Sequence, residues 1–350
     1  MVERIKDVGE FGLIRRIREL LDREGVSTPG VTLGIGDDTA AFLPRPGCEI
    51  LITCDSLVEG RHFLPDWITF EALGRRAMVQ NISDIGAMGG RPLYALVSLG
   101  LKEDLPLEKI DDLYRGFLKE LNPFQASIIG GNLTRCGAEL FIDITLIGEA
   151  EQGKTLKRGG ARKGDALLVS GCPGRAAAGL DLLLHRPDDP RLKDHPLVRA
   201  YQTPTHRARL GEKVARAGWA TAMIDISDGF LGDLGHILSE SRVGARLFPE
   251  RFPIPQELKE AAEELGRNPL AFFLGPSDDY ELIITCPPEN AEKILDLGKA
   301  LDPPVSLTVV GAINDRPEVI TLAAGDGTET PVSLGGWDHF LEKTRRRKNG

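Results

Sequence analysis

Apolar residues recur every three to four positions in several parts of the chain, which is the period of an amphipathic helix. In residues 10–21 this stripe includes Phe11 and Ile17, and we expect a helix that packs the stripe on a sheet. A second stripe begins after Thr69, a residue suited to capping a helix, and ends at Gly89. The same period predicts further helices at 107–121, 175–184, 206–217, 231–239 and 289–301.

Short apolar runs between turn residues predict strands. They occupy 50–54, 93–101, 127–129, 141–147, 166–170, 221–226, 281–285, 307–310 and 319–322. The run at 127–129 leads into Gly130-Gly131-Asn132, which we interpret as a tight turn. Helices and strands follow one another without strict alternation, so the pattern favours an α+β fold over a doubly wound sheet.

The length of 350 residues exceeds the usual size of one domain. Residues 148–164 are rich in Gly, Lys and Arg and contain few large apolar side chains, as is typical of a linker. We therefore predict two domains. Their expected bounds are residues 1–150 and residues 151–350.

Composition excludes several classes of function. The formal net charge is -9 and the one cationic run, 345–348, is short, which argues against a nucleic-acid partner. No apolar run approaches the roughly 18–20 residues that cross a membrane. The five cysteines are an odd number without a CxxC pair, so structural zinc and a disulfide framework are disfavoured. A cytoplasmic protein fits these features best.

Acidic side chains occur at five turns that also contain Gly, Ser or Thr: 34–40, 53–56, 81–84, 225–229 and 277–281. Scattered carboxylates suit Mg²⁺, which prefers oxygen ligands and is often shared with substrate phosphates. The chain has no EF-hand spacing, HExxH motif or P-loop. If it is a phosphoryl-transfer enzyme, it must hold ATP by metals and backbone amides. Singly, each motif could be an ordinary turn or helix cap, as Asp228 could be. Asp84, late in an apolar helix, instead needs a cation or donor.

Taken together and in order, the motifs resemble a known family. The sequences GEFGLI, GIGDD, TCDSLVEGRHF, NISDIGAMGGRP, IIGGN, DISDGFLGDLGHI, DDYEL and WDHF are similar to those of thiamine-monophosphate kinases. That family shares a superfamily with aminoimidazole ribonucleotide synthetase, selenophosphate synthetase and the hydrogenase maturation factor HypE. The likeness extends over about residues 9 to 340, and VEGRHF and WDHF resemble the kinase branch in particular.

The resemblance implies a two-domain homodimer whose N-terminal sheets pair, and transfer of the ATP γ-phosphoryl group to thiamine monophosphate. It also implies that residues 1–150 bind metal and ATP and form the dimer contact, and that residues 151–350 complete the nucleotide and substrate site. It further implies several Mg²⁺ ions and the following roles. The metal positions are Asp38, Thr53, Cys54, Asp55, Asp84, Asn132, Asp225 and Asp228. The ATP contacts are Tyr114, Gly131, Asn132, Arg158 and Ser227, with Arg158 adding charge stabilisation. The substrate contacts are His62, Asp278 and Trp337, the last of which could alternatively be a core tryptophan.

Three positions depart from the family pattern. Asn132 stands where the family usually has Asp, and Asp278 replaces a longer Glu. Cys54 replaces a hydroxyl residue, although the backbone carbonyl of Cys54 could still serve as a ligand. An active kinase with altered metal affinity is one interpretation. A paralogue that binds nucleotide or thiamine phosphate with little turnover is a second, and an ATP-dependent relative acting on an amidine ribonucleotide is a third.

Overall fold

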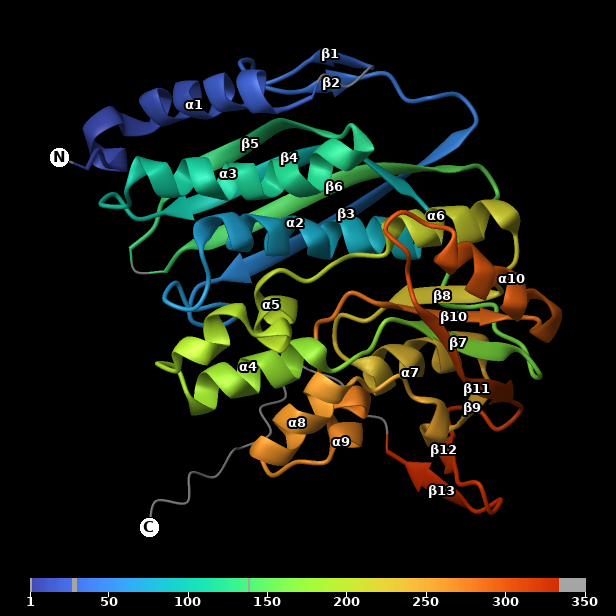
Figure 1. Ribbon diagram of the computed structural model, residues 1–350. Coiled ribbons are helices and arrows are strands. Elements are labelled where there is room, and N and C mark those ends of the chain that lie inside the picture. Colours follow the sequence, from blue (N-terminus) through green and yellow to red (C-terminus); the bar gives the residue numbers. More distant parts are fainter. Residues whose placement is uncertain (1, 27–29, 138, 334–350) are drawn as a thin grey trace.

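The computed structural model describes residues 2–26, 30–137 and 139–333, in which helices and strands assemble around two main sheets (Figure 1). We call residues up to 151 the N-terminal half and the later residues the C-terminal half. The N-terminal half contains α1 (Ile5–Glu24), β1 (Val31–Leu33), β2 (Ala41–Phe42), β3 (Cys48–Val58), α2 (Phe70–Ala87), β4 (Arg91–Leu101), α3 (Leu107–Leu121), β5 (Ser127–Arg135) and β6 (Phe141–Glu151).

The C-terminal half contains β7 (Ala166–Ser170), α4 (Arg175–His185), α5 (Pro196–Gln202), α6 (Ala208–Ala217), β8 (Ala222–Asp225), α7 (Phe230–Ser241), β9 (Gly244–Leu247), α8 (Gln256–Glu264), α9 (Pro269–Leu274), β10 (Leu282–Cys286), α10 (Pro288–Lys299), β11 (Leu307–Asn314), β12 (Ile320–Ala323) and β13 (Glu329–Val332). Helices and strands mix as the sequence predicts, so the α+β class is confirmed. The division into domains after residue 150 stays a prediction, and it falls at the end of β6.

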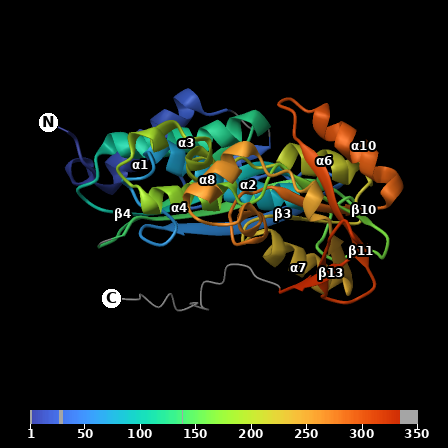
Figure 2. The same cartoon turned by 60° about the horizontal axis from the view of Figure 1, so that its bottom comes forward.

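The four-stranded sheet of the N-terminal half has the order β3-β6-β4-β5. Figure 2 shows α1, α2 and α3 on the same side of it. Alternate residues of β6, such as Ile142 and Ile144, are fully buried on the helix side. The opposite side carries Ile52, which is 68% exposed, together with Cys54, Asp143 and Thr145. We call this side the open face of the sheet.

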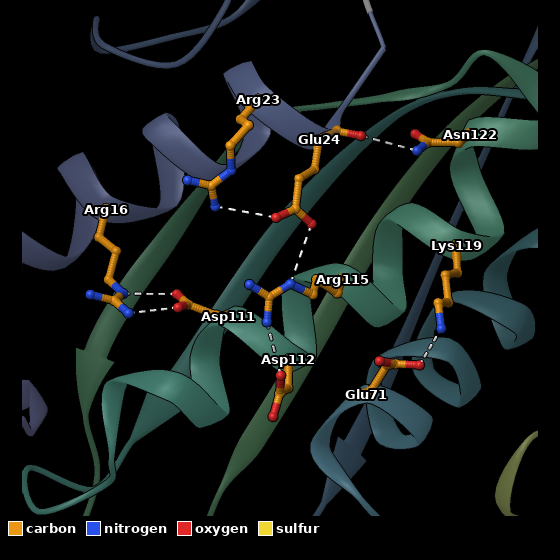
Figure 3. Close-up of polar contacts among 9 residues, drawn as sticks. All are labelled: Arg16, Arg23, Glu24, Glu71, Asp111, Asp112, Arg115, Lys119 and Asn122. Carbon is orange, nitrogen blue, oxygen red and sulfur yellow. Dashed lines mark hydrogen bonds and ion pairs between the residues drawn. The ribbon is translucent and has the colours of Figure 1, made fainter. Parts of the chain in front are cut away.

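Helix α1 differs from its prediction in the side that it buries. Leu13, Ile17 and Leu20 are buried, whereas Phe11 is 79% exposed, so placing Phe11 in the stripe was wrong. Phe11 lies two residues before Leu13, about 200° away around the helix. The main partner of α1 is α3 and not the sheet. Figure 3 shows two hydrogen bonds, 2.8 and 2.6 Å long, from Arg16 of α1 to Asp111 of α3.

The segment Gly130-Gly131-Asn132, predicted as a turn, continues strand β5. Gly131 pairs with Val97 of β4, and a Cβ atom on Gly131 would lie only 1.9 Å from the Val97 carbonyl oxygen. Glycine therefore permits a close approach between the two strands, and the sequence signal for a turn arose from that requirement.

The C-terminal sheet has the order β13-β12-β9-β11-β7-β10-β8, and β8 is its edge strand next to α2. The two halves meet without a gap at helices α2 and α6. A Cβ on Gly86 of α2 would lie 2.4 Å from the Cα of Ala208 in α6, and one on Gly211 would lie 2.0 Å from the Gly86 carbonyl oxygen. Helix α2 thus supports both sheets. Within the described residues, no helix is long and apolar enough to span a membrane.

Candidate active site

Carboxylates from both halves of the chain meet where α2 passes the edge strands β3 and β8. Asp55 comes from β3, Asp84 from the last turns of α2 and Asp225 from the end of β8. Asp55 and Asp84 hydrogen-bond to each other, and the Thr53 hydroxyl also donates to Asp84. The Ser83 hydroxyl donates to Asp225 over 2.7 Å. Asp228, three residues beyond the strand, is close enough to repel Asp55.

We call Asp55, Asp84, Asp225 and Asp228 the carboxylate cluster. Burial, followed by repulsion from Asp84, raises the pKa of Asp55 to about 7. Burial also raises the pKa of Asp84, against the opposing effects of the Thr53 hydrogen bond and the charge of Arg158. Asp225 is fully enclosed, so burial raises its pKa well above the ordinary value and Asp84 adds to the rise.

A cavity of about 540 Å³ adjoins this cluster. Thr53, Asp84 and Asp225 line it from the two halves, and Arg158 lines it from the loop between β6 and β7. The cavity therefore places one guanidinium beside several acidic side chains, on an opening large enough for part of a nucleotide.

The turn that carries Asp228 is fixed by a residue that the sequence interpretation missed. The backbone N–H groups of Ser227, Asp228 and Gly229 all donate to one carboxylate oxygen of Asp233, over 3.0–3.1 Å. Asp233 is 2% exposed, and burial raises its pKa to about 7. Its position in the first turn of α7 was the available signal, because an acid there often binds free N–H groups.

The carboxylate cluster and the Thr53 hydroxyl offer oxygen atoms that could bind a divalent cation. Asp84 and Asp225 line the cavity, and Asp55 lies beside Asp84. Lys157 and Arg158 are the cations among the lining residues, so the ionised cluster still has an excess of negative charge that a cation would relieve. Across the described ranges, no three His, Cys, Asp or Glu side chains form a ready-made metal group. Mg²⁺ commonly completes its shell with water and phosphate oxygens, so the cluster fits such an ion.

Other sequence-predicted metal positions lie apart from the cluster within the chain. Asp38 is exposed in the turn between β1 and β2, and Gly36 of the same turn lies beside Arg18 of α1. This turn is near β5, at the opposite edge of the sheet from β3 (Figure 1). The Cys54 side chain lies on the open face, where its Sγ is 3.5 Å from Asp143, so it points away from Asp55.

The predicted nucleotide contacts divide in the same way. Arg158 and Ser227 lie near the cluster, but Gly131 and Asn132 lie on β5. Asp55 is in register with Gly131 through β6 and β4, a span of three strand spacings or about 14 Å. Tyr114 is 4% exposed in the core of the N-terminal half, where it packs edge-on against Phe117.

The predicted substrate contacts lie toward the other end of α2. The imidazole Nδ1 of His62 accepts a hydrogen bond from the Val58 backbone over 3.0 Å. Asp278, in the loop before β10, pairs with Arg76 of α2, which the sequence interpretation also missed. A charged residue between inward-facing helix positions was the signal for Arg76. Trp337 lies outside the described residues.

Comparisons with known proteins agree with this arrangement. Residues 36–150 match the family model "AIR synthase related protein, N-terminal domain", and residues 162–322 match its C-terminal counterpart. The thiamine-monophosphate kinase of Aquifex aeolicus is 34% identical over 339 residues, which cover 96% of this chain and 100% of that protein.

Two solved structures are similar over nearly the whole chain. The thiamine-monophosphate kinase of Stenotrophomonas maltophilia K279a has a TM-score of 0.79 at 31% identity, covering 92% of this chain and 98% of that one. AaThiL complexed with AMPPCP and TMP has a TM-score of 0.73 at 33% identity, covering 97% and 99%. The resemblance drawn from the motifs is confirmed. The chain therefore belongs to the thiamine-monophosphate kinase family of AIR synthase related proteins.

Proposed function

We propose that this protein transfers the γ-phosphoryl group of ATP to thiamine monophosphate, giving thiamine diphosphate and ADP. The observation that carries the proposal is the meeting of Asp55, Asp84, Asp225 and Asp228 beside Arg158. Residues from both halves of the chain contribute to this single site. Membership of the kinase family and similarity to AaThiL complexed with AMPPCP and TMP support the choice of substrates.

Two anionic phosphate groups must approach each other in this reaction, and positive charge is needed between them. The carboxylate cluster and the Thr53 hydroxyl would hold Mg²⁺ ions, which neutralise phosphate charge and align the reacting oxygens when bound. Arg158 would pair with the nucleotide phosphates by charge-assisted hydrogen bonds. Ser227 would contact the nucleotide from the turn that Asp233 fixes.

The acceptor phosphate is already ionised near neutral pH, so the chain need not supply a strong general base. His62 and Asp278 would orient the acceptor at the far end of the site, and Trp337 would offer an aromatic face to its cationic thiazolium ring. We assign Tyr114, Gly131 and Asn132 to nucleotide binding, and Asp38, Cys54 and Asn132 to additional metal contacts, from the family resemblance.

We further propose a homodimer that pairs the open faces of two N-terminal sheets. Ile50 and Ile52, two residues apart in β3 and 36% and 68% exposed, lie together on this face and support that arrangement. Asp38, which lies apart from the cluster of its own chain, would then serve the cluster of the second copy. All five cysteines are free thiols, which supports placing the protein in the reducing cytoplasm.

Incubating the purified protein with ATP, Mg²⁺ and thiamine monophosphate tests the function, with thiamine diphosphate and ADP separated by chromatography. Stoichiometric formation of both products is expected. Asn132, which lacks the charge of the family's Asp, favours the alternative of a weakly active paralogue. That alternative predicts tight binding of thiamine monophosphate without product. Ring closure of an amidine ribonucleotide, with no thiamine diphosphate formed, would identify a relative with another substrate.

A further inference from the structure

Arg76 is a buried arginine of α2 that joins three segments distant in sequence. Its side chain is 3% exposed. One terminal nitrogen donates to the backbone carbonyl of Tyr201 in α5, and the other donates to the carboxylate of Asp278. The guanidinium carbon also lies 4.6 Å from the centroid of the Tyr201 ring. One side chain of the N-terminal half thus fixes two elements of the C-terminal half.

This arrangement is a poor way to gain stability. A buried charge must recover the cost of leaving water, and an apolar side chain of similar volume often does as well or better. In addition, the Nε atom of Arg76 is buried without a hydrogen-bond partner in the described structure. An unused donor on a buried cation carries a further cost. The charge at position 76 therefore points to a role beyond packing.

Arg76 contacts Asp278 directly and His62 through Tyr201, and these are the two described residues that we assign to binding of the acceptor substrate. Asp278 pairs with Arg76 directly and keeps 31% of its side chain exposed, so it can still face a ligand. The hydroxyl of Tyr201, whose ring the guanidinium covers, donates to the His62 backbone carbonyl oxygen over 3.5 Å. Arg76 and Tyr201 therefore link the backbone at His62 to the carboxylate of Asp278.

The same loop also reaches the carboxylate cluster. Tyr280 is 3% exposed and has a φ of 54°, a conformation that non-glycine residues rarely adopt. Its backbone N–H donates to the Ile226 carbonyl over 2.8 Å, and its side chain lies within electrostatic reach of Asp278 and Asp55. The cluster end of this loop is therefore held by its own backbone bond to Ile226, whereas Arg76 holds only the end that carries Asp278.

We propose that Arg76 is a positioning residue that sets the affinity for the acceptor substrate. The inference rests on the proposed function. Arg76 holds the Asp278 carboxylate in one orientation and neutralises it. Asp278 can then accept a hydrogen bond from a phosphorylated, cationic heterocycle without adding negative charge near its phosphate. Binding of ATP, which involves Arg158 and the carboxylate cluster, does not depend on this pair.

Steady-state kinetics of Arg76→Met, Arg76→Lys and the control Arg75→Met test the proposal. Arg75 is the neighbouring arginine, and its Nε donates to Glu120 over 2.6 Å, outside the acceptor site. Arg76→Met should raise the KM for thiamine monophosphate at least about tenfold, the loss typical of one charge-assisted contact. The KM for ATP should stay within about twofold. The KM of Arg76→Lys for thiamine monophosphate should lie between those of the wild type and Arg76→Met. Arg75→Met should have both KM values of the wild type.

Asp278→Asn provides a second route if Arg76→Met does not fold. It should raise the KM for thiamine monophosphate with the KM for ATP unchanged. Where both variants fold, the double variant should raise the KM for thiamine monophosphate by less than the product of the two single increases. The reason is that both substitutions remove the same contact. An equal rise in both KM values, or no rise in either, would overturn the inference. If the wild type makes no thiamine diphosphate, the proposed function fails and the inference fails with it.

Discussion

Replacing Asp55 by Asn should increase the stability of the metal-free protein at pH 8 while removing most of its activity. Burial, followed by repulsion from Asp84, raises the pKa of Asp55 from 3.8 to about 7. Between these values the folded protein retains a proton that the unfolded chain has lost. The stability contributed by this group therefore falls as pH rises through that window and stays low above it.

The magnitude follows from the size of the pKa rise. At about 1.4 kcal/mol per pH unit, ionising Asp55 in the folded protein costs roughly 4 kcal/mol. Asn cannot ionise, but it replaces the carboxylic acid in its contacts imperfectly, at a cost of about 2 kcal/mol. We therefore expect the free energy of unfolding of Asp55→Asn to exceed that of the wild type by about 2 kcal/mol at pH 8, and to be nearly equal at pH 5.

Urea unfolding in EDTA at pH 5 and pH 8 measures this difference. Asp315→Asn is a suitable control, because Asp315 is an exposed carboxylate whose pKa is lowered by Lys163 and which should give no gain at pH 8. In the kinase assay, Asp55→Asn should lower kcat/KM at least about 100-fold. A variant less stable than the wild type at both pH values would refute the view that Asp55 is a crowded carboxylate. Unchanged turnover would refute its assignment as a metal ligand.

Three further predictions concern packing, loop geometry and assembly. Gly86→Ala should lower the free energy of unfolding by about 2 kcal/mol, because its Cβ would collide with α6, whereas Gly325→Ala, in open space, should change it little in the same denaturant titration. Asp233→Ala should leave three backbone N–H groups without an acceptor, costing about 2 kcal/mol and weakening ATP binding measured by calorimetry. Asn at 233 keeps one oxygen, so an equal loss there would contradict this explanation. Asp38→Asn and Asp84→Asn should each be inactive alone, but after subunit exchange their mixture should recover about a quarter of wild-type activity. No recovery would exclude shared sites.

Local sequence patterns predicted much of the fold because many elements depend on local rules. Helix α2 begins after Thr69, whose hydroxyl accepts a hydrogen bond from the Ala72 backbone as its capping signal predicts. Strand β7 and helix α3 match their predicted bounds. The failures arose where tertiary contacts decide. Gly131 belongs to a strand because of Val97 on the neighbouring strand, and no local pattern contains that information.

The site was predictable in its chemistry but not in its geometry. Asp55 and Asp225 belong to motifs that each resemble an ordinary turn, although Asp55 lies inside β3. The meeting of both residues with Asp84 depends on how α2 packs between the two sheets. Asp38 lies in a motif of the same type, an acidic residue beside Gly and Thr. In its own chain, however, it lies near the opposite edge of the sheet. Arg76 carries no motif, since its importance comes from partners 125 and 202 residues away.

The contact between Gly86 and Gly211 restricts how this protein can move during turnover. Because the backbones of α2 and α6 are in direct contact, a hinge motion that opens and closes the two halves is disfavoured. We therefore expect entry of ATP and release of products to rely on local segments such as the turn that carries Asp38 and the loop that carries Arg158. We expect the packed helices to stay fixed while these loops move. Substitutions in the loops should then change the catalytic rate more than substitutions between the two halves.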